Sequence, residues 1–554
     1  MVIRASESPV TKMLGDMIFS DKRVALHLHK GYISTLTGSV RKLDRLPDYL
    51  DTNPQTHQTL QTYMSPTPDL RVVSVNDFPV QTDGDYVLYW MTAFRRTGWN
   101  FSLQRAVEWA VKLQKPLVVL EAIRCDYPLA CDRFHAVILN GMNDNRHGFE
   151  GKPVLYYPFV EERAGQGKGL VSALCIRACV VVTDAFPCFF LPRMLQAAAG
   201  QCRVKLESVD SNGLMPLRAV DLVFTTAYSF RRFLQKNMIQ YLQDFPEPDP
   251  LFRISLPVLS ALPADILLKW PPASPNALAA DPQILKSLPI SHHPEPVPGF
   301  SGGQTAGRQV LNAFLSERFR AYNETRNHPD ENATSGLAPY LHFGHISSHN
   351  IVSDILKMEN WTVDQLMKVP ARGQRTGWWQ LSDSAEAFFD QIITWRELGF
   401  NMCFQKPNDY DQFSSLPGWA QKELNQHTSD SRPHLYSAEA LENATTHDPL
   451  WNAAQIQLVR EGRIHNYLRM LWGKKILEWS SCPQEALQTM IHLNNTYSLD
   501  GRDPNSYTGI FWILGRYDRP WGPARPIFGK IRYMSSENTR RKLKLKAYLQ
   551  RYRK

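Results

Sequence analysis

The chain has 554 residues and a mass of 63.4 kDa, which is room for two or three domains, because a single hydrophobic core rarely grows past a few hundred residues. Hydrophobic residues make up 43% and charged residues 21%, which excludes a disordered chain, and the net charge of +9 suggests a polyanionic partner. Eight cysteines without a CxxC pair, and no apolar run near the roughly 20 residues of a membrane helix, disfavour a disulfide-bonded, metal-binding or membrane protein.

Residues 1–80 show no clear periodicity. Pro47, Pro54 and the polar run from Thr52 to Thr62 suggest loose structure, and no secretory signal peptide is visible. We interpret this segment as an N-terminal extension of an intracellular protein. The sequence leaves open whether that protein lies in the cytoplasm of a prokaryote, in a nucleus or in an organelle.

An alternation of strands and helices follows over residues 81–225. YVLYW, from Tyr86 to Trp90, and LVVLEAI, from Leu117 to Ile123, read as strands, and Ser102 to Lys115 has the apolar spacing of a helix. Further elements of this pattern are a helix from Phe134 to Met142 and strands at Val154 to Tyr157, Cys179 to Val182 and Val204 to Val209. Such an alternation predicts an α/β domain with a parallel, Rossmann-like sheet covered on both faces.

Proline is concentrated in residues 226–305, where PEPDP, PPASP and HHPEPVPG lie between Asp244 and Phe300. This composition predicts an extended interdomain linker. Residues 306–536 then read as helical almost throughout, so we expect an all-α C-terminal domain. Its predicted helices run from Gln309 to Ser316, His349 to Met358, Ala385 to Phe404, Leu450 to Glu478 and Gln484 to Leu493.

Residues 537–554 form a basic tail. They contain eight basic side chains and one acidic side chain, so +7 of the net charge lies here and only about +2 in the rest of the chain. Two interpretations stay open: a frayed, solvated helix, or an arm that contacts nucleic-acid phosphates without sequence preference.

Three tryptophans stand on predicted helices, at Trp451, Trp472 and Trp479. The last two are seven residues apart, which is two helical turns, so they share one face. Taken alone, this spacing is more typical of core packing than of an electron path.

Two polar segments of the helical domain could bind a ligand. NNTYSLDGRDPN, from Asn494 to Asn505, carries carboxylates and amides that suit a polar heterocycle, although an exposed turn would read the same way. TSGLAPYLHFG, from Thr334 to Gly344, has a hydroxyl pair and a glycine before a helix, which suits phosphate oxygens. GQGKG, from Gly165 to Gly169, fits no phosphate-loop spacing and reads as a plain loop.

Together these segments resemble the photolyase/cryptochrome family, and most closely the class II cyclobutane pyrimidine dimer photolyases. The strongest match, from Asp448 to Asn505, contains DPLWNAAQ, GRIHNYLRM, KKILEW and NNTYSLDGRDPN. Further blocks are WGPARPIFGKIRYM from Trp521 to Met534, TSGLAPYLHFGHIS, and WRELGFNMCF from Trp395 to Phe404. The resemblance covers roughly residues 85–534, and it is weaker in the α/β half.

The resemblance implies an FAD whose excited, reduced form gives an electron to a cyclobutane pyrimidine dimer in DNA. It also implies that the dimer is flipped out of the duplex, because photolyases are base-flipping enzymes. It implies dimer-containing DNA as the partner, no metal, and a monomer. It also allows an antenna chromophore, a deazaflavin or a folate, in the α/β domain. The alternative is a cryptochrome-like photoreceptor or a diverged relative with altered or lost repair.

By position, the resemblance assigns residues to three groups. The residues that would contact the phosphates of FAD are Tyr322, Thr334, Ser335 and Leu337. Asn494 would lie near flavin N5, and the Arg469–Asp500 pair would lie beside the ring. Asp503 would lie near the ribose or the ring edge. Trp451, Trp472 and Trp479 would form the chain that photoreduces the flavin, in place of the core-packing interpretation. Gln391, Trp395, Met470 and Trp512 would contact the dimer, and Arg519 and Arg532 the DNA phosphates.

In the α/β half, the stretch from Arg96 to Asn100 departs from the family pattern, and in the helical half three positions depart from it. Gln391 replaces a glutamate that hydrogen-bonds the dimer, Ala338 replaces a serine, and His345 replaces a glutamine. Glutamine can still donate and accept hydrogen bonds, but it cannot carry the charge of a carboxylate. Gln391 therefore favours the diverged relative, whereas the retained Trp395 and Trp512 favour repair.

Overall fold

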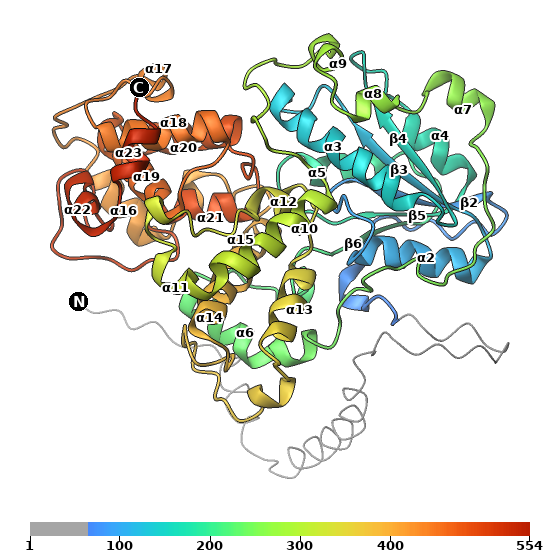
Figure 1. The fold of residues 1–554 in the computed structure, drawn as a ribbon, viewed down its shortest axis with the longest axis horizontal. Coiled ribbons are helices and arrows are strands. Elements are labelled where there is room, and N and C mark those ends of the chain that lie inside the picture. Colours follow the sequence, from blue (N-terminus) through green and yellow to red (C-terminus); the bar gives the residue numbers. More distant parts are fainter. Residues whose placement is uncertain (1–64) are drawn as a thin grey trace, which may run out of the picture. The chain divides into compact units, whose positions relative to one another are not determined.

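The computed structural model describes residues 65–554, and in it an α/β half is followed by a helical half (Figure 1). Six strands form one sheet in the order β1-β6-β5-β2-β3-β4. Neighbouring strands are parallel except β1 and β6, where Val72 faces Val209 in an antiparallel pair. The strands are β1 (Val72–Ser74), β2 (Tyr86–Met91), β3 (Leu117–Ile123), β4 (Val154–Val160), β5 (Ala178–Asp184) and β6 (Leu206–Val209). The predicted fold class is confirmed.

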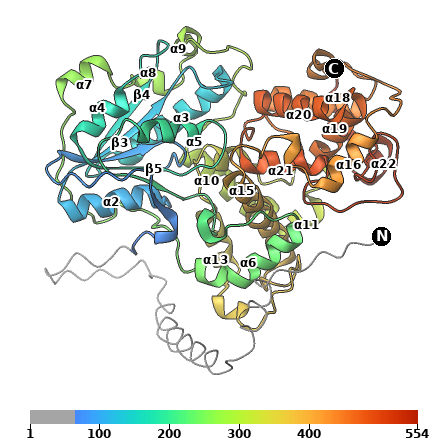
Figure 2. The ribbon, with the colours of Figure 1, turned by 180° about the vertical axis from the view of Figure 1, so that it is seen from behind.

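Helices cover both faces of this sheet (Figures 1 and 2). On β2, Val87 and Tyr89 pack toward α2 (Phe101–Leu113), whereas Leu88 and Trp90 pack toward α4 (Leu170–Arg177). This alternation follows from the pleat of a strand. Because both faces are covered, the central strands read as continuous apolar runs in the sequence. The other helices of this half are α3 (Asp132–Phe149) and α5 (Leu191–Ala199).

Part of the predicted N-terminal extension belongs to the sheet. A short 3₁₀ turn (Asp69–Arg71) leads into β1, and the Asn76 side chain then donates to Val204 O and accepts from Leu206 N, both at 3.0 Å. The boundary placed at residue 81 is therefore too late. A three-residue strand is too short to show an alternating pattern, which is why the sequence did not reveal it. Residues 1–64 lie outside the described part of the chain.

The proline-rich linker contains four helices. The first, α6 (Ala227–Tyr241), packs into the helical core, whereas α7 (Ala264–Lys269), α8 (Pro275–Leu278) and α9 (Pro282–Ser287) lie against the α/β half. Pro275 and Pro282 each follow a capping residue, Ser274 and Asp281, whose side chain accepts from the first turn. Proline at the first helical position starts a helix, so these prolines are not the breakers that the composition suggested.

The helical half is continuous in sequence from α10 onward. Its helices are α10 (Gln304–Ala313), α11 (Tyr322–Thr325), α12 (Ala338–His342), α13 (Ser348–Met358), α14 (Asp383–Phe389), α15 (Arg396–Gln405), α16 (Gly418–Gln426), α17 (Ala438–Glu442), α18 (Pro449–Glu461), α19 (Asn466–Trp479), α20 (Pro483–Tyr497) and α21 (Pro504–Ile513). A π-helical turn, η8 (Asp390–Trp395), joins α14 to α15. Turns of this kind occur often at functional sites.

The helix predicted from Leu450 to Glu478 is two helices. Gly462 has a φ of +62°, and its N–H donates to Leu458 O at 3.0 Å, which ends α18. Glycine adopts this left-handed conformation without steric cost, so it serves as the stop between α18 and α19. The turn brings Trp451, on α18, back against the helix that carries Trp472.

The basic tail is docked. It forms α22 (Ser536–Lys542) and α23 (Lys546–Arg551), and the side chains of Tyr548 and Tyr552 are buried in the core of the helical half. Neither the frayed helix nor the free arm describes this segment, because tyrosines four residues apart give α23 an apolar face. The basic residues Arg540, Arg541, Lys546 and Arg553 remain exposed.

The two halves are joined by buried arginines. Arg96 donates to Gly344 O at 3.0 Å, and Arg133 on α3 donates to Tyr497 O and Val459 O, both at 2.7 Å. Gly344 has a φ of +75°, and a Cβ here would lie 1.8 Å from Ala93 O. Only glycine therefore permits this close approach of the α12–α13 turn to the end of β2.

Candidate flavin and DNA site

Three polar side chains assigned to the flavin ring meet in the helical half. Arg469 comes from the first turn of α19, Asn494 from the last turn of α20, and Asp500 from the loop that follows. The Arg469 guanidinium lies 3.1 Å from a carboxylate oxygen of Asp500 and donates to the amide oxygen of Asn494 at 3.4 Å. Asn494 donates to the Ser506 hydroxyl at 2.6 Å. These bonds fix the orientation of the amide and connect the three residues.

The carboxylate of Asp500 keeps its charge although it lies in the interior. Burial alone would raise its pKa, but the charge of Arg469 and the hydroxyl of Ser498 hold the pKa of Asp500 below its ordinary value. The ion pair therefore persists at neutral pH. It sets a fixed electric field around the space that these residues border.

Asp503 and His342 present buried polar atoms without hydrogen bonds. Asp503 caps α21, where its Oδ1 accepts from Asn505 N at 2.8 Å, whereas Oδ2 accepts no hydrogen bond in residues 65–554. Nδ1 of His342, on α12, lies 3.5 Å from that oxygen and also makes no hydrogen bond. Buried polar atoms are nearly always paired in native proteins, so this juxtaposition fits a polar ligand such as FAD. The sequence contained His342 in a matching block but did not single it out.

The residues assigned to the FAD phosphates lie between α11 and α12. Tyr322 opens α11, and Leu337 N donates to the Ser335 hydroxyl at 3.3 Å just before α12, next to Thr334. The Arg326 guanidinium lies over the Tyr322 ring at 5.4 Å, and its buried Nε has no partner in the described part of the chain. Guanidinium groups suit phosphate oxygens, so these residues fit the diphosphate of FAD. Arg326 was missed because it stands outside the matched blocks.

The three tryptophans form a connected series in which Trp451 is central. Its indole N–H donates to Trp472 O at 2.9 Å, and its ring centre lies 5.5 Å from that of Trp479. Trp472 donates to Gln455 Oε1 at 2.9 Å. All three side chains are at most 2% exposed, so they are part of the core as well as in contact. The sequence indicated that Trp472 and Trp479 share one helix face. The structure adds that Trp451, from the other helix, is in contact with both.

The residues assigned to the dimer are half-buried. Gln391 and Trp395 lie on η8, and Met470 and Trp512 lie on α19 and α21. Within the described residues, neither the amide of Gln391 nor the indole N–H of Trp395 or Trp512 makes a hydrogen bond. Such aromatic and amide groups are free to contact a base-like ligand.

Arg519 and Arg532 lie around one indole, that of Trp521. Their guanidinium carbons are 4.4 and 3.9 Å from its ring centre, and Arg532 also lies 5.3 Å from the ring centre of Trp512. Asp518 accepts from the Nε of Arg532 at 2.9 Å. Arg519 is exposed, whereas Arg532 already has a carboxylate partner, so the two arginines are not equivalent toward phosphate. Trp521 was missed as a site residue, although it opens the matched block two residues after Arg519.

Lys474, on α19, is a fully buried lysine beside this group. Its ammonium donates to Ile513 O at 2.5 Å and lies 5.5 Å from the ring centre of Trp512. Burial lowers the pKa of Lys474 to about 7, with Asp518 opposing and Arg532 reinforcing the effect. The side chain thus connects the end of α21 to α19 beneath Trp512.

We expect Lys474 to make the stability of the fold rise with pH. Above pH 7 the unfolded chain keeps a proton that the native lysine has lost, so the free energy of unfolding increases until about pH 10. Between pH 7 and 9 the wild type should gain about 2 kcal/mol relative to Lys474→Met in urea unfolding. Lys475→Met, which removes a lysine paired with Glu478, is the control. Equal pH profiles for wild type and Lys474→Met would contradict the shifted pKa.

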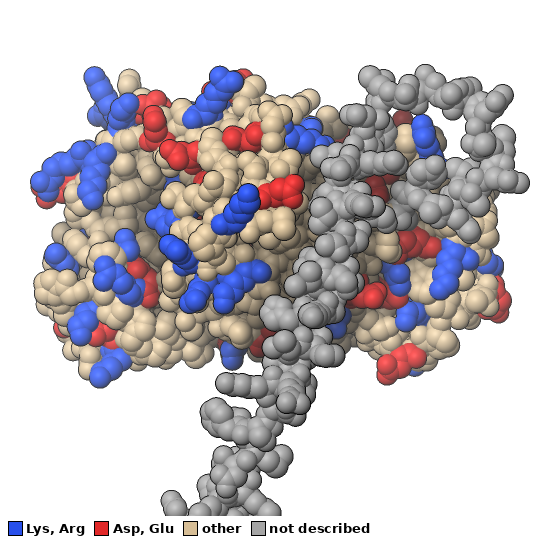
Figure 3. Space-filling view, turned by 90° about the horizontal axis from the view of Figure 1, so that it is seen from below, with Lys and Arg blue, Asp and Glu red and all other residues tan. Residues whose placement is uncertain are grey.

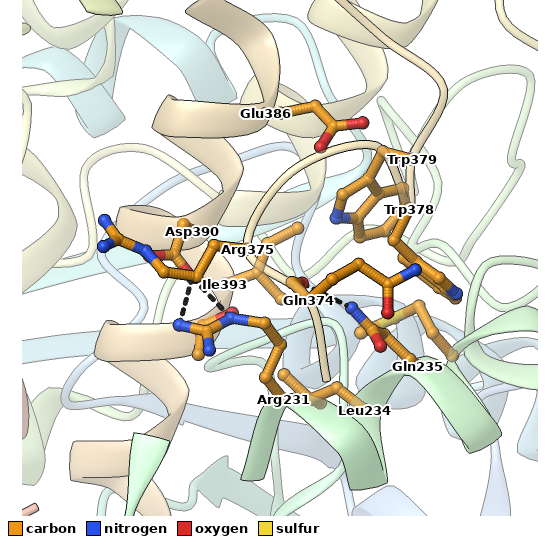
Figure 4. A pocket seen from close by; sticks show the side chains of 12 residues that line it. Arg231, Leu234, Gln235, Gln374, Arg375, Trp378, Trp379, Glu386, Asp390 and Ile393 are labelled. Atoms are coloured by element: carbon orange, nitrogen blue, oxygen red, sulfur yellow. Dashed lines mark hydrogen bonds and ion pairs between the residues drawn. The ribbon is translucent and has the colours of Figure 1, made fainter. Parts of the chain in front are cut away.

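A pocket borders η8 without containing the side chains assigned to the dimer. It is formed by α6, the chain before α14, α14 itself and η8, and Trp378 and Trp379 line it (Figure 4). Arg231 donates to Asp390 at 2.7 Å across this pocket, and both side chains are buried. The pair anchors η8 to α6, because separating it would leave an uncompensated buried charge.

His345, where the family usually has glutamine, fills space at the junction of the two halves. Its Nδ1 accepts from Gly303 N at 3.0 Å, and a Cβ on Gly141 would lie 2.3 Å from its Nε2. Burial lowers the pKa of His345 to about 3, so the ring is neutral. This departure therefore concerns the packing of α3 against the helical half. Ala338 opens α12 and lacks the hydroxyl of the usual serine.

Charge and metal-ligand patterns mark no second site. Lys and Arg side chains are interspersed with Asp and Glu over the face seen from below (Figure 3). In residues 65–554, no three His, Cys, Asp or Glu side chains are grouped as a metal site requires. Among the same residues, no helix combines the length and the apolar character needed to cross a membrane.

Comparisons with known proteins give several close relatives. No family model matches the sequence. The chain is 31% identical over 486 residues to the deoxyribodipyrimidine photo-lyase of Methanothermobacter thermautotrophicus, which covers 87% of this chain and 98% of that protein. It is 33% identical over 482 residues to the deoxyribodipyrimidine photo-lyase of Oryza sativa subsp. japonica, which covers 84% and 87% of the two chains.

Two solved structures share the fold. A bacterial class III photolyase from Agrobacterium tumefaciens superposes with a TM-score of 0.58 at 17% identity, over 85% of this chain and 86% of that one. An archaeal photolyase from Sulfolobus tokodaii, solved with two FAD molecules, superposes with a TM-score of 0.56 at 15% identity, over 84% and 88%.

Proposed function

The chain belongs to the deoxyribodipyrimidine photo-lyase family, whose members repair pyrimidine dimers in DNA with light, and from this premise we propose which of its residues hold the flavin and the dimer. The resemblance read from the sequence is thus confirmed at the level of the family, and the photoreceptor alternative is not favoured. Assignment to class II and the monomeric, metal-free state remain part of the proposal.

The observation that carries the proposal is the connected group of Arg469, Asp500 and Asn494, together with the buried, facing atoms of His342 and Asp503, which make no hydrogen bond. When bound there, reduced FAD supplies, on excitation, the electron that opens the cyclobutane ring. The ion pair orients the ring edge and fixes the field around it, and the Asn494 amide stabilises a reduced flavin without acting as an acid. Arg326, with the Thr334–Leu337 segment, would neutralise the diphosphate.

The dimer would lie against the half-buried group of Gln391, Trp395, Met470 and Trp512. Two indole faces suit two stacked, saturated pyrimidines, and the unpaired Gln391 amide can both donate to and accept from their imide edges. Arg519, exposed over Trp521, would contact a phosphate and position the DNA without reading its sequence. We also propose an antenna chromophore, a deazaflavin or a folate, in the α/β half, and an intracellular site of action.

A single experiment tests this function. The purified protein is reduced and illuminated with an oligonucleotide that contains one thymine dimer, and restored thymines are measured by chromatography. We expect repair under light and none in darkness. If a flavin-loaded, reduced protein restores no thymines, the proposed activity is wrong.

Gln391→Glu should raise repair. A glutamate would provide a stronger, charged acceptor to a dimer imide, and charge-assisted hydrogen bonds are about twice as strong as neutral ones. We expect repair per absorbed photon, or affinity for the dimer, to rise about threefold. Gln484→Glu, on the exposed surface of α20, is the control. An unchanged Gln391→Glu protein would mean that this side chain does not reach the dimer.

A further inference from the structure

The docked C-terminal segment connects two regions that border the flavin site. We propose that residues 544–552, which we name the C-terminal clasp, hold that site closed and slow the release of FAD. Tyr548 and Tyr552 of the clasp and Asp330 opposite it act as positioning residues. The inference rests on the FAD assignment made above.

On one side, the clasp holds the chain between Tyr322 and Thr334. Both carboxylate oxygens of Asp330 accept from the clasp backbone, from Tyr548 N at 2.7 Å and Ala547 N at 3.2 Å. Lys544 O accepts from Asp330 N at 3.3 Å, and the Lys544 ammonium lies 2.6 Å from Glu331. These bonds fix the turn that leads from Arg326 into the proposed phosphate-binding segment.

On the other side, the clasp holds the turn between α18 and α19 through Gln457. The Gln457 Oε1 accepts from the Tyr548 hydroxyl at 2.8 Å and from His465 N at 3.0 Å, and its Nε2 donates to the Tyr552 hydroxyl at 3.3 Å. His465 is the residue before α19, one turn before Arg469. Gln457 therefore couples the clasp to the start of the helix that carries the flavin ion pair.

The Tyr552 hydroxyl continues this network to Glu461, near the end of α18. It donates to the Glu461 carboxylate at 2.6 Å, which also pairs with Arg551 at 2.7 Å. The two tyrosine rings lie 4.7 Å apart and are 4% exposed. The clasp thus buries its aromatic face between both regions while its basic side chains face outward.

This arrangement has a consequence for the ligand. We expect FAD held between the Tyr322–Leu337 stretch and α19 to leave more readily when these regions separate. The clasp is bonded to the first region directly and to the start of α19 through Gln457. The clasp is held by hydrogen bonds to Asp330, Gln457 and Glu461, so loss of these bonds loosens it locally. Weakening its contacts should therefore change FAD release more than it changes the fold.

The test measures FAD dissociation from the holoprotein after dilution, by recovery of free flavin fluorescence. Tyr548→Phe/Tyr552→Phe keeps both rings but removes the hydroxyl contacts with Gln457 and Glu461. Asp330→Ala removes the hydrogen bonds that its carboxylate accepts from the clasp backbone. We expect each variant to release FAD about tenfold faster, while the melting temperature of the apoprotein stays within a few degrees of the wild type. Deleting residues 544–554 should accelerate release further.

Tyr86→Phe is the matched control, because it removes a buried phenol that donates to Leu174 O in the α/β half. Wild-type release rates in both clasp variants would overturn the proposal, and so would equal acceleration by Tyr86→Phe. If an acceleration merely parallels a fall in apoprotein stability, the clasp is a general stabiliser and the proposal is again wrong. A wild-type protein that binds no FAD at all would instead contradict the proposed function.

Discussion

Trp472→Phe will slow photoreduction of the bound flavin by about 100-fold while leaving repair by chemically reduced protein within about twofold. The reason is the way the tryptophans contact one another. Trp451 touches both Trp472 and Trp479, and Trp472 lies on the same helix as Arg469, one turn later. Loss of Trp472 removes the member that follows Arg469 by one turn of α19. Phenylalanine is much harder to oxidise than tryptophan and does not replace it. Flash photolysis under aerobic conditions gives the photoreduction rate, and dimer repair after dithionite reduction gives the second readout.

Trp378→Phe is the control for packing. Trp378 is a buried tryptophan beside α14 and outside the series, so its loss removes similar apolar area without touching the electron path. We expect normal photoreduction in this variant. If Trp472→Phe impairs both photoreduction and repair by pre-reduced protein to the same degree, then Trp472 acts only through core packing. The interpretation first drawn from its spacing would then be the correct one.

The parts of the fold that sequence predicted are those with long, self-contained patterns. YVLYW and LVVLEAI became β2 and β3 because both faces of the sheet are covered, so each strand is apolar except for Glu121 in β3. What sequence missed depends on a single residue or on distant contacts. Gly462 ends α18 only because its φ is positive there, and β1 is defined by its pairing with β6.

The tail shows how composition can mislead. Eight basic residues suggested a solvated segment, but the fate of this segment is decided by Tyr548, Tyr552 and Leu545, which occupy the core of the helical half. The charges only line its outer side. Net charge was thus a poor guide to the structure of this part of the chain.

The candidate site could be predicted where motif residues act through their own side chains. Arg469, Asp500 and Asn494 meet as assigned, because the α19 start, the α20 end and the following loop converge. His342 and Arg326 could not be predicted, since their distinguishing property is a buried atom without a hydrogen bond, which only the structure reveals. Trp451 likewise acquires its central place from the α18–α19 hairpin.

Asp500→Asn should cause the largest loss of FAD binding among single substitutions. The Arg469 guanidinium is mostly buried, and without the carboxylate its charge would lack a partner, a loss that costs about 3–5 kcal/mol when the pair is broken from one side. We expect FAD affinity to fall by about 100-fold or more, measured as the flavin content of purified protein and by titration of apoprotein. Because the pKa of Asp500 lies below its ordinary value, the carboxylate stabilises the fold above the unfolded pKa, and this contribution is lost as pH falls. The free energy of unfolding should accordingly fall less on acidification in Asp500→Asn than in the wild type.

The double variant Arg469→Met/Asp500→Asn separates the pair from the buried charge. Removing both partners leaves no uncompensated guanidinium, so fold stability should recover by about 2 kcal/mol relative to Asp500→Asn alone. FAD affinity should stay low in the double variant, because the field and the bond to Asn494 are absent. If the double variant is no more stable than Asp500→Asn, then the loss does not come from a stranded charge, and the ion pair is not the element that organises this site.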